Sequence, residues 1–219
     1  MSFDINKRDS QATEVEAIKP NNFDFDAYVD YEKELLQRTD EFFNSKSGVA
    51  VYRRMRAAEV FADGSRDMQR SLELQLGCLK ESLKFKSDIP NFLEPWYGIG
   101  TCASAYGAEY VWNKGQAPAV LPLFDKTKEA LSYNPISIAQ TNIGRHTLDM
   151  IDYFLTQTKG KLPMSYTDSQ SPLNASTMIV NNTNIFMDII LDPESVKKLL
   201  DKLAELMVDF VLEQKKLNG

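Results

Sequence analysis

One acidic and two aromatic side chains stand together beside a pair of glycines in DIPNFLEPWYGIGTCASAYG, residues 88–107. Glu94 is a candidate catalytic residue, because a carboxyl group can act as a general acid or base. Trp96 and Tyr97 are candidate substrate-binding residues, since aromatic rings offer a flat apolar wall to a planar ligand. The competing interpretation is that the two rings only pack the loop.

A second polar group follows the apolar run at residues 162–167. Asp168 is the strongest single candidate for a catalytic residue, and Ser169 and Gln170 beside it are candidates for substrate binding. The alternatives are an Asx-type turn at Asp168 or Ser169, or Asn174 as the cap of the next helix.

Other motifs carry weaker signals. Residues 98–103 match G-x-G-x-x-A, a pattern of dinucleotide-binding loops, but no βαβ unit ending in an acidic residue at the right distance accompanies it. We therefore interpret Gly98 and Gly100 as glycines that permit tight backbone geometry. His146 is the only histidine and is interpreted as a surface or capping residue, and Cys78 and Cys102 lie far apart. Because a zinc site usually takes about four clustered ligands, we predict no metal site and two buried free thiols.

Composition excludes several classes of protein. Hydrophobic residues make up 43% and charged residues 26% of the 219 residues, which is typical of a globular chain. The formal net charge of −6 argues against a nucleic-acid partner, and we interpret the basic pairs Arg53-Arg54 and Lys215-Lys216 as solvated helix faces. No signal peptide or membrane-spanning run is evident, so we expect no membrane association and a cytoplasmic protein.

The hydrophobic pattern predicts helices and strands in alternation. Residues 1–22 are expected to form a flexible tail and residues 23–87 an N-terminal helical segment. Predicted helices cover residues 23–43, 49–61, 65–84, 126–133, 143–158, 173–179 and 192–211. Predicted strands cover residues 89–93, 109–112, 119–124 and 162–167. The order of these elements favours an α/β fold with parallel strands.

Two stretches together resemble the uroporphyrinogen decarboxylase superfamily, which also contains corrinoid-dependent methyltransferases. Residues 88–110 are similar to the first barrel strand and following helix, with Tyr106-Gly-Ala-Glu109 matching a recurring "fGae" pattern. LPMSYTDSQSPLNAS, residues 162–176, is similar to the strand and turn before a helix, and a helix opening with Asp192-Pro-Glu194 follows. The resemblance covers roughly Arg53 to Gly219.

The resemblance implies N-terminal helices followed by a (β/α)8 TIM-type barrel whose site lies at the carboxyl ends of the strands. Such a barrel takes about 250 residues, so residues 88–219 are expected to form only its first part. The chain would then be an N-terminal half, inactive alone, that associates as a homodimer through its open barrel edge.

The resemblance also implies a function. Decarboxylases of the family bind substrate carboxylates with an arginine-rich loop, but residues 94–100 contain no arginine, and the family's catalytic tyrosine corresponds to Met178. We therefore expect methyl transfer from a corrinoid (methylcobamide) donor to a thiol acceptor when the protein is complete. Zinc, the corrinoid and a corrinoid protein as partner are implied by the resemblance only, and no cofactor site is evident in this chain. The alternatives are a uroporphyrinogen decarboxylase of tetrapyrrole biosynthesis with a tetrapyrrole ligand, and a non-catalytic half-barrel or binding module.

Overall fold

The computed structural model describes residues 14–45, 47–85 and 87–218. The chain divides into two compact units, Met1–Glu94 with Tyr153–Ser165, and Pro95–Asp152 with Tyr166–Gly219. Because the two units are not placed relative to one another, each is described separately.

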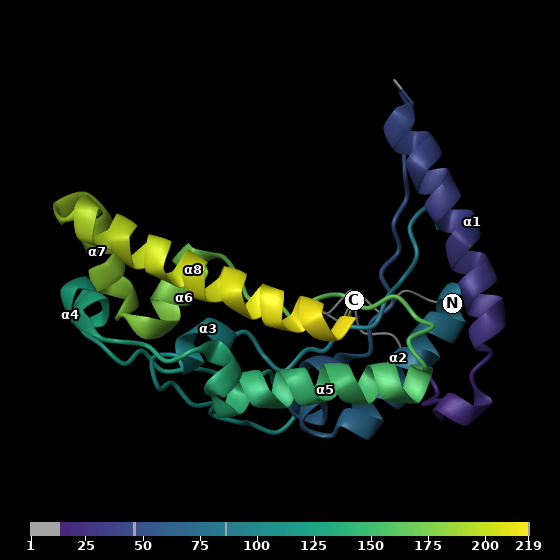
Figure 1. The fold of residues 1–219 in the computed structure, drawn as a ribbon, viewed down its shortest axis with the longest axis horizontal. Helices are drawn as coiled ribbons and strands as arrows, with labels where there is room; N and C mark the ends of the chain where they lie inside the picture. The colour runs from purple at the N-terminus through teal and green to yellow at the C-terminus, as the bar shows by residue number, and fades with distance from the viewer. Residues whose placement is uncertain (1–13, 46, 86, 219) are drawn as a thin grey trace. The chain divides into compact units, whose positions relative to one another are not determined.

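The described part of the first unit is built from helices and extended segments (Figure 1). Its elements are η1 (Pro20–Asn22), α1 (Phe25–Asn44), η2 (Ala58–Phe61), η3 (Asp63–Arg66) and α2 (Met68–Ser82). Residues 153–158 of α5 (Asn142–Thr158) also belong to this unit. The side chain of Asp24 caps α1 by accepting a hydrogen bond from the Ala27 N–H, and Asp67 caps α2 by accepting from the Arg70 N–H. These caps satisfy backbone donors that an α-helix leaves without partners.

The second unit contains most of the remaining helices. They are α3 (Thr101–Ser104), α4 (Thr127–Ser132), η4 (Ile138–Gln140), α5 (Asn142–Thr158), α6 (Pro172–Ile179), α7 (Asn182–Leu191) and α8 (Pro193–Asn218). α8 packs against α4, α6 and α7 (Figure 1).

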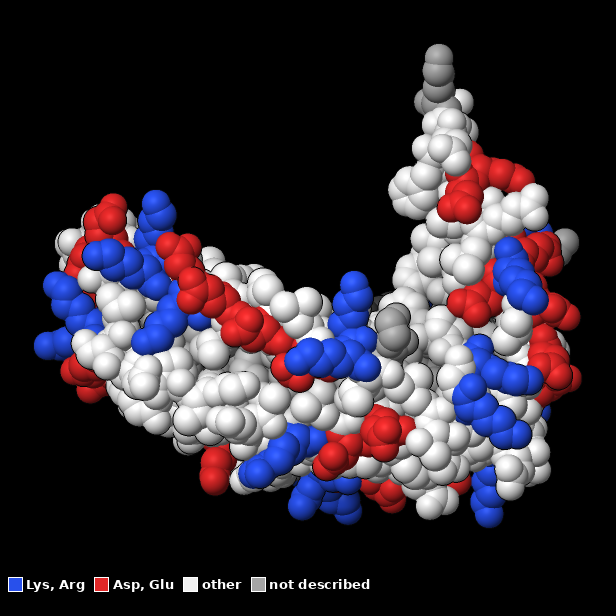
Figure 2. All heavy atoms as spheres, in the orientation of Figure 1, with Lys and Arg blue, Asp and Glu red and all other residues white. Residues whose placement is uncertain are grey.

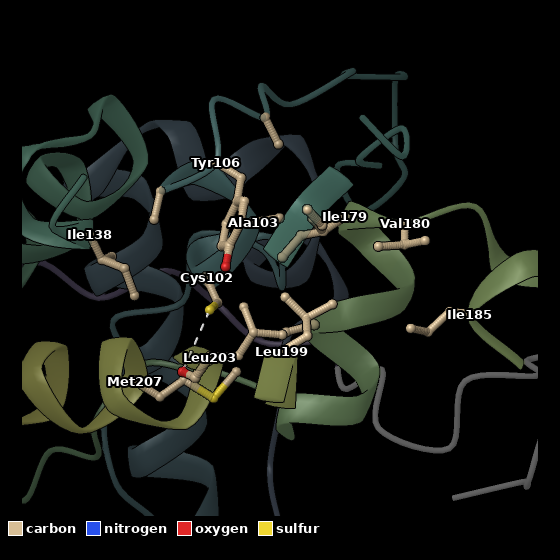
Figure 3. Close-up of a cluster of buried hydrophobic side chains, with 14 of the residues drawn as sticks. Cys102, Ala103, Tyr106, Ile138, Ile179, Val180, Ile185, Leu199, Leu203 and Met207 are labelled. Atoms are coloured by element: carbon tan, nitrogen blue, oxygen red, sulfur yellow. Dashed lines mark hydrogen bonds between the residues drawn. The ribbon is translucent and has the colours of Figure 1, made fainter. Parts of the chain in front are cut away.

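The apolar face of α8 closes the core of the second unit. Leu199 and Leu203 are fully buried there, beside Ile179 of α6. In Figure 3 the Cys102 side chain points at α8, where its Sγ lies 3.9 Å from the Leu203 carbonyl oxygen. The core therefore depends on the long helix that the sequence predicts at residues 192–211.

The predicted α/β fold class is wrong: the described residues form helices α1 to α8 and no β-strand. Of the expected barrel strands only isolated bridges are present, namely Leu93 with Met164 (parallel), Val111 with Ala119 (antiparallel) and Phe124 with Val180 (parallel). Strand-like composition therefore does not produce a sheet among the residues that the structure describes.

Prolines explain why the bridge at Leu93 does not grow into a ladder. The Leu93 N–H donates to the Pro163 carbonyl, and the Ser165 N–H donates to the Leu93 carbonyl. The next parallel bonds would need N–H groups on residues 95 and 163, and both are prolines, which have none. The next ladder hydrogen bond therefore cannot form on either side of the bridge.

Side chains bind the backbone groups that a strand would have used. Tyr28 donates its hydroxyl to the Asn91 carbonyl (2.6 Å). The Asn91 amide accepts from the Met55 N–H (2.8 Å) and donates to the Arg53 carbonyl (3.0 Å). The same contacts explain why the helix predicted at residues 49–61 is wrong: residues 49–55 are irregular, and only the short η2 follows.

The other helix predictions are confirmed within a few residues. α1, α2, α4, α5 and α6 correspond to predicted helices, and α8 begins at Pro193 after Asp192, as expected. α7 was not predicted. No helix in the described part of the chain is long and apolar enough to cross a membrane.

Residues 1–13 of the predicted flexible tail lie outside the described residues. In the rest of that segment, the Ile18 side chain is buried and the Ile18 N–H donates to the Glu73 carbonyl of α2 (2.9 Å).

Candidate functional site

Glu94 lies in the first unit, between two arginines. Its carboxylate pairs with Arg54 and with Arg56, whose Nη2 is 2.7 Å from Oε1. The side chains of Arg54 and Glu94 are each 14% exposed and that of Arg56 is 27% exposed, so solvent screens these pairs weakly. The two guanidinium groups compensate the negative charge of the Glu94 carboxylate. A catalytic role for Glu94 stays a prediction.

The surroundings hold this ion cluster in place. The guanidinium of Arg54 lies 3.8 Å from the centroid of the Phe92 ring, and that of Arg56 lies 4.3 Å from the Phe61 ring. The backbone of Glu94 exchanges two hydrogen bonds with the side-chain amide of Gln75 on α2. Arg54, which the sequence suggests is a solvated side chain of a helix, is instead part of this cluster.

The second unit contains a cavity of about 450 Å³, a volume typical of small-molecule sites. Tyr97 is the predicted substrate-binding residue that lines it. Tyr110 and Trp112, which sequence reasoning assigned to a short strand, form the wall with it. The ring centroids of Tyr97 lie 5.6 Å from Tyr110 and 5.5 Å from Trp112, and Tyr110 lies 5.6 Å from Trp112.

His146 supports this wall from α5. Its ring stacks on Tyr97 with the centroids 3.7 Å apart and the planes at 26°. The sequence suggested a surface or capping histidine, so this contact was missed. Stacking restricts the orientation of the Tyr97 ring at the cavity.

Gly98 and Gly100 make room for the Tyr110 ring. A Cβ on Gly100 would lie 2.7 Å from Tyr110 Cε1 and 2.3 Å from Val120 Cγ2, and Gly98 has a φ of +88°. The Gly100 N–H donates to the Tyr110 hydroxyl (2.9 Å). The two glycines therefore leave space for the Tyr110 ring. This agrees with our interpretation that the glycines of the G-x-G-x-x-A match permit tight backbone geometry.

The start of α5 adds positive charge to the lining. Thr141 caps α5, since its Oγ1 accepts from the Gly144 N–H (2.9 Å). Asn142 and Ile143, the first residues of α5, line the cavity together with Arg145. The N-terminus of a helix attracts negative charge, and Arg145 adds a guanidinium whose Nη2 donates to Asn142 Oδ1 (3.0 Å).

The remaining polar lining is mixed. Ser104 and Thr141 share a hydrogen bond of 2.9 Å between their hydroxyls and are buried. Glu109 and Gln140 are exposed. Glu109 and Arg145 are the ionisable carboxylate and cation among the described lining residues.

The predicted residues Asp168, Ser169 and Gln170 form a loop before α6. Asp168 accepts hydrogen bonds from the Gln170 N–H (2.9 Å) and from Gln170 Nε2 (2.7 Å). Gln170 has a left-handed φ of 61° and accepts a bond from Asn174. These contacts form the Asx-type turn named as an alternative.

Asp168 is only a minor influence on the cavity residue Tyr110, whose pKa is set mainly by burial. Burial raises the pKa of the Tyr110 phenol, the hydrogen bond from Gly100 opposes that rise, and the charge of Asp168 adds to it. Asp168 does not line the cavity, and neither do Ser169 and Gln170. Their roles in catalysis and substrate binding stay predictions.

The other residues singled out by sequence lie elsewhere. Trp96 is 6% exposed and is not part of the cavity lining. Cys78 and Cys102 are buried free thiols, which confirms that prediction. No group of three or more His, Cys, Asp or Glu residues in the described chain has the arrangement to hold a metal ion. The described residues thus do not fit the zinc that the resemblance implies.

Comparison with known proteins decides the family. The model of the family described as Uroporphyrinogen decarboxylase (URO-D) matches residues 48–218. The chain belongs to the uroporphyrinogen decarboxylase family. This confirms the predicted resemblance and nearly its predicted extent, which began at Arg53. No curated protein matches the chain.

The matched URO-D region spans parts of both units. Residues 48–94 carry the ion cluster around Glu94, and residues 95–145 carry the cavity wall and Arg145. Family membership alone does not specify which reaction the chain carries out.

Proposed function

We propose that this URO-D family protein transfers a methyl group from a methylated corrinoid, carried by a partner protein, to a small thiol acceptor bound in the cavity of the second unit. The observation that carries the proposal is the lining of that cavity, which combines aromatic rings with one positively charged corner.

The charge of the lining supports this function over porphyrinogen decarboxylation. Uroporphyrinogen bears many carboxylates, and each needs a cationic or hydrogen-bonding partner when it leaves water. Arg145 is the one cation among the described residues that line the cavity. The described lining suits a smaller ligand with a single negative charge.

The same corner suits a thiolate. The thiolate is the nucleophilic form of a thiol, and nearby positive charge stabilises it. Arg145 and the N-terminus of α5 supply that charge, and we assign Glu109 to accept the thiol proton. The sulfur then forms its bond to the methyl carbon as the methyl–cobalt bond breaks, and the electron pair of that bond stays on the corrinoid cobalt.

Family resemblance also implies a zinc ion that activates the thiol. Since the described residues do not form a zinc site, no step of this proposal depends on one.

The chain was expected to be inactive alone because it would form half of a barrel, but its described residues form no barrel strand. The test is therefore a methyl-transfer assay on the purified chain, in the dark, with methylcobalamin and a set of small thiols. The proposal expects thioether formation by mass spectrometry, together with loss of the methylcobalamin absorbance, at a rate above the protein-free background. A parallel reaction contains uroporphyrinogen. Decarboxylation of the porphyrinogen without any thioether product would overturn the proposal.

A further inference from the structure

We infer that the ligand of the second-unit cavity is a planar aromatic molecule with one anionic group. The inference names the substrate class of the acceptor site, an aromatic thiol whose thiolate is the anionic group, and its role in methyl transfer rests on the proposed function. Its evidence is the geometry of the aromatic wall and of the start of α5.

The wall selects a flat ring. Tyr110 meets Tyr97 at 73° and Trp112 at 81°, both edge to face, and Tyr97 and Trp112 are tilted at 43°, so the three rings do not form a single stack. Such a group presents both faces and edges to a neighbouring ring, and offset or edge-to-face contacts between aromatic rings are favourable beyond the area that they bury.

The wall is also held in a fixed position. The hydroxyl of Tyr110 is bonded to the Gly100 N–H, and the Tyr97 ring is stacked on His146. A rigid wall loses little conformational entropy when a ligand binds, which favours a rigid planar ligand over a flexible chain.

The anionic group follows from the corner formed by α5. The hydroxyl of Thr141 is bonded to the Gly144 N–H, and the carbonyl of Thr141 accepts from the Arg145 N–H. Asn142 and Ile143 precede these residues, at positions where an α-helix leaves N–H groups without intrahelical partners. The Arg145 guanidinium adds fork-shaped donors that match a carboxylate.

The balance of charge limits the ligand to one anionic group. Glu109 also lines the cavity, so a second negative charge on the ligand would meet a carboxylate and no second cation among the described lining residues. Of the anionic aromatic compounds, those with a single charge therefore fit best.

Binding is tested by calorimetry with three probes: benzoate, benzyl alcohol and cyclohexanecarboxylate. Benzoate combines the ring with the charge, whereas the other probes lack the charge or the planar ring. We expect benzoate to bind with a Kd of about 1 mM or tighter, as is typical of such small ligands, and each of the others at least about fivefold more weakly. Equal binding of all three, or no benzoate binding, would overturn the inference.

A charge-removing variant locates the site. Arg145→Gln removes the guanidinium but keeps a polar side chain at an exposed position of α5. A hydrogen bond to a charged group contributes about 1.5 kcal/mol or more, so benzoate should bind about tenfold more weakly. Lys114→Gln is the matched control, because it removes one exposed positive charge that does not line the cavity.

The two variants distinguish a direct contact between Arg145 and the ligand from a general effect of positive charge on ligand binding. Weaker binding in Arg145→Gln with unchanged binding in Lys114→Gln supports the inference, and equal loss in both overturns it. The proposed function fails separately: benzoate binding without any methyl transfer refutes the reaction and leaves the ligand class intact. Methyl transfer without benzoate binding refutes the ligand class alone.

Discussion

Single residues shape the cavity wall, and Gly100 is the one whose role is best defined. Its position admits no side chain, because a Cβ would lie 2.3 Å from Val120 Cγ2 and 2.7 Å from the Tyr110 ring. The aromatic wall thus depends on a residue that does not itself line the cavity.

Gly100→Ala is expected to displace the Tyr110 ring. Overpacking of this kind costs about 1–3 kcal/mol, so the free energy of unfolding in urea should fall by that amount and benzoate binding should weaken. Gly115→Asn is the control. A Cβ added to Gly115 would have no heavy atom within 4 Å, and asparagine tolerates the φ of +69° at this position. Equal stability of Gly100→Ala and the wild type would contradict the described packing.

The buried thiols predict a pH dependence at the alkaline end. Burial raises the pKa of Cys102 to about 12 and that of Cys78 to about 11, from an ordinary value of 9.0. Below pH 9.0 both thiols are protonated in the folded and the unfolded chain, so they add no pH dependence. Above it the unfolded chain loses the protons first, and the free energy of unfolding should fall by about 1.4 kcal/mol per pH unit for each thiol.

The variant Cys102→Ala separates the thiol from the tyrosines, which titrate in the same direction. Its free energy of unfolding should fall less steeply than that of the wild type between pH 9.0 and about 11. Identical slopes in the two proteins would show that the Cys102 thiol is not buried.

At the scale of elements, the ion cluster joins the extended segment at residues 54–56 to the segment at residues 92–94. Glu94→Gln would leave Arg54 and Arg56 without their carboxylate partner. Breaking a buried ion pair costs about 3–5 kcal/mol, and we expect about 3 kcal/mol in urea unfolding because Arg56 is 27% exposed.

Glu59→Gln is the matched control for this prediction. Glu59 forms a two-point contact with Arg70, but the two side chains are 46% and 42% exposed. Surface pairs of this kind contribute about 1 kcal/mol or less. Similar losses of unfolding free energy in both variants would mean that the ion pairs of Glu94 stabilise the protein no more than the exposed pair of Glu59 and Arg70.

The apolar face of α8 gives the matching prediction for the second unit. Leu203 is fully buried in the core, so Leu203→Ala should cost about 2–5 kcal/mol through lost burial and the cavity that remains. Val208 on the same helix is 58% exposed, and Val208→Ala should change stability by about 0.5 kcal/mol or less. Thermal unfolding that cannot distinguish the two variants would refute the assigned face of α8.

The sequence predicts helices well and strands poorly for a physical reason. Asp24, Asp67 and Asp192 mark helix starts through local caps, and local contacts are readable from spacing. A strand needs a partner, and whether residues 89–93 find one depends on Pro95 and Pro163, which block the ladder. That outcome is set by residues far apart in the chain.

The candidate site shows the same limit. Tyr97 was identified because it adjoins the glycine pair, whereas Tyr110 joins the wall only through the fold. Arg145 and Thr141 carried a usable signal, a capping threonine and a cation at a predicted helix start, but sequence reasoning considered only the neighbouring His146. The arginines that pair with Glu94 lie some forty residues before it, a separation at which spacing carries no information.

At the scale of the whole molecule, acidic and basic side chains are interspersed over the face in Figure 2. Along α8 the exposed residues Asp201, Glu205 and Asp209 recur every four positions and form an acidic row. We expected a homodimer because an incomplete barrel would expose strand edges. The described residues form no strand, so they do not supply that reason. The dimer is an untested prediction, and sedimentation of the purified chain would test it.

The most direct test of the account is the initial rate of thiol methylation from methylcobalamin by the wild type and by Arg145→Gln, at one thiol concentration below saturation. We predict thioether formation by the wild type and a rate about tenfold lower in the variant, with the melting temperatures of both proteins alike. Equal rates in the two proteins, or no thioether formation by the wild type, would contradict the account.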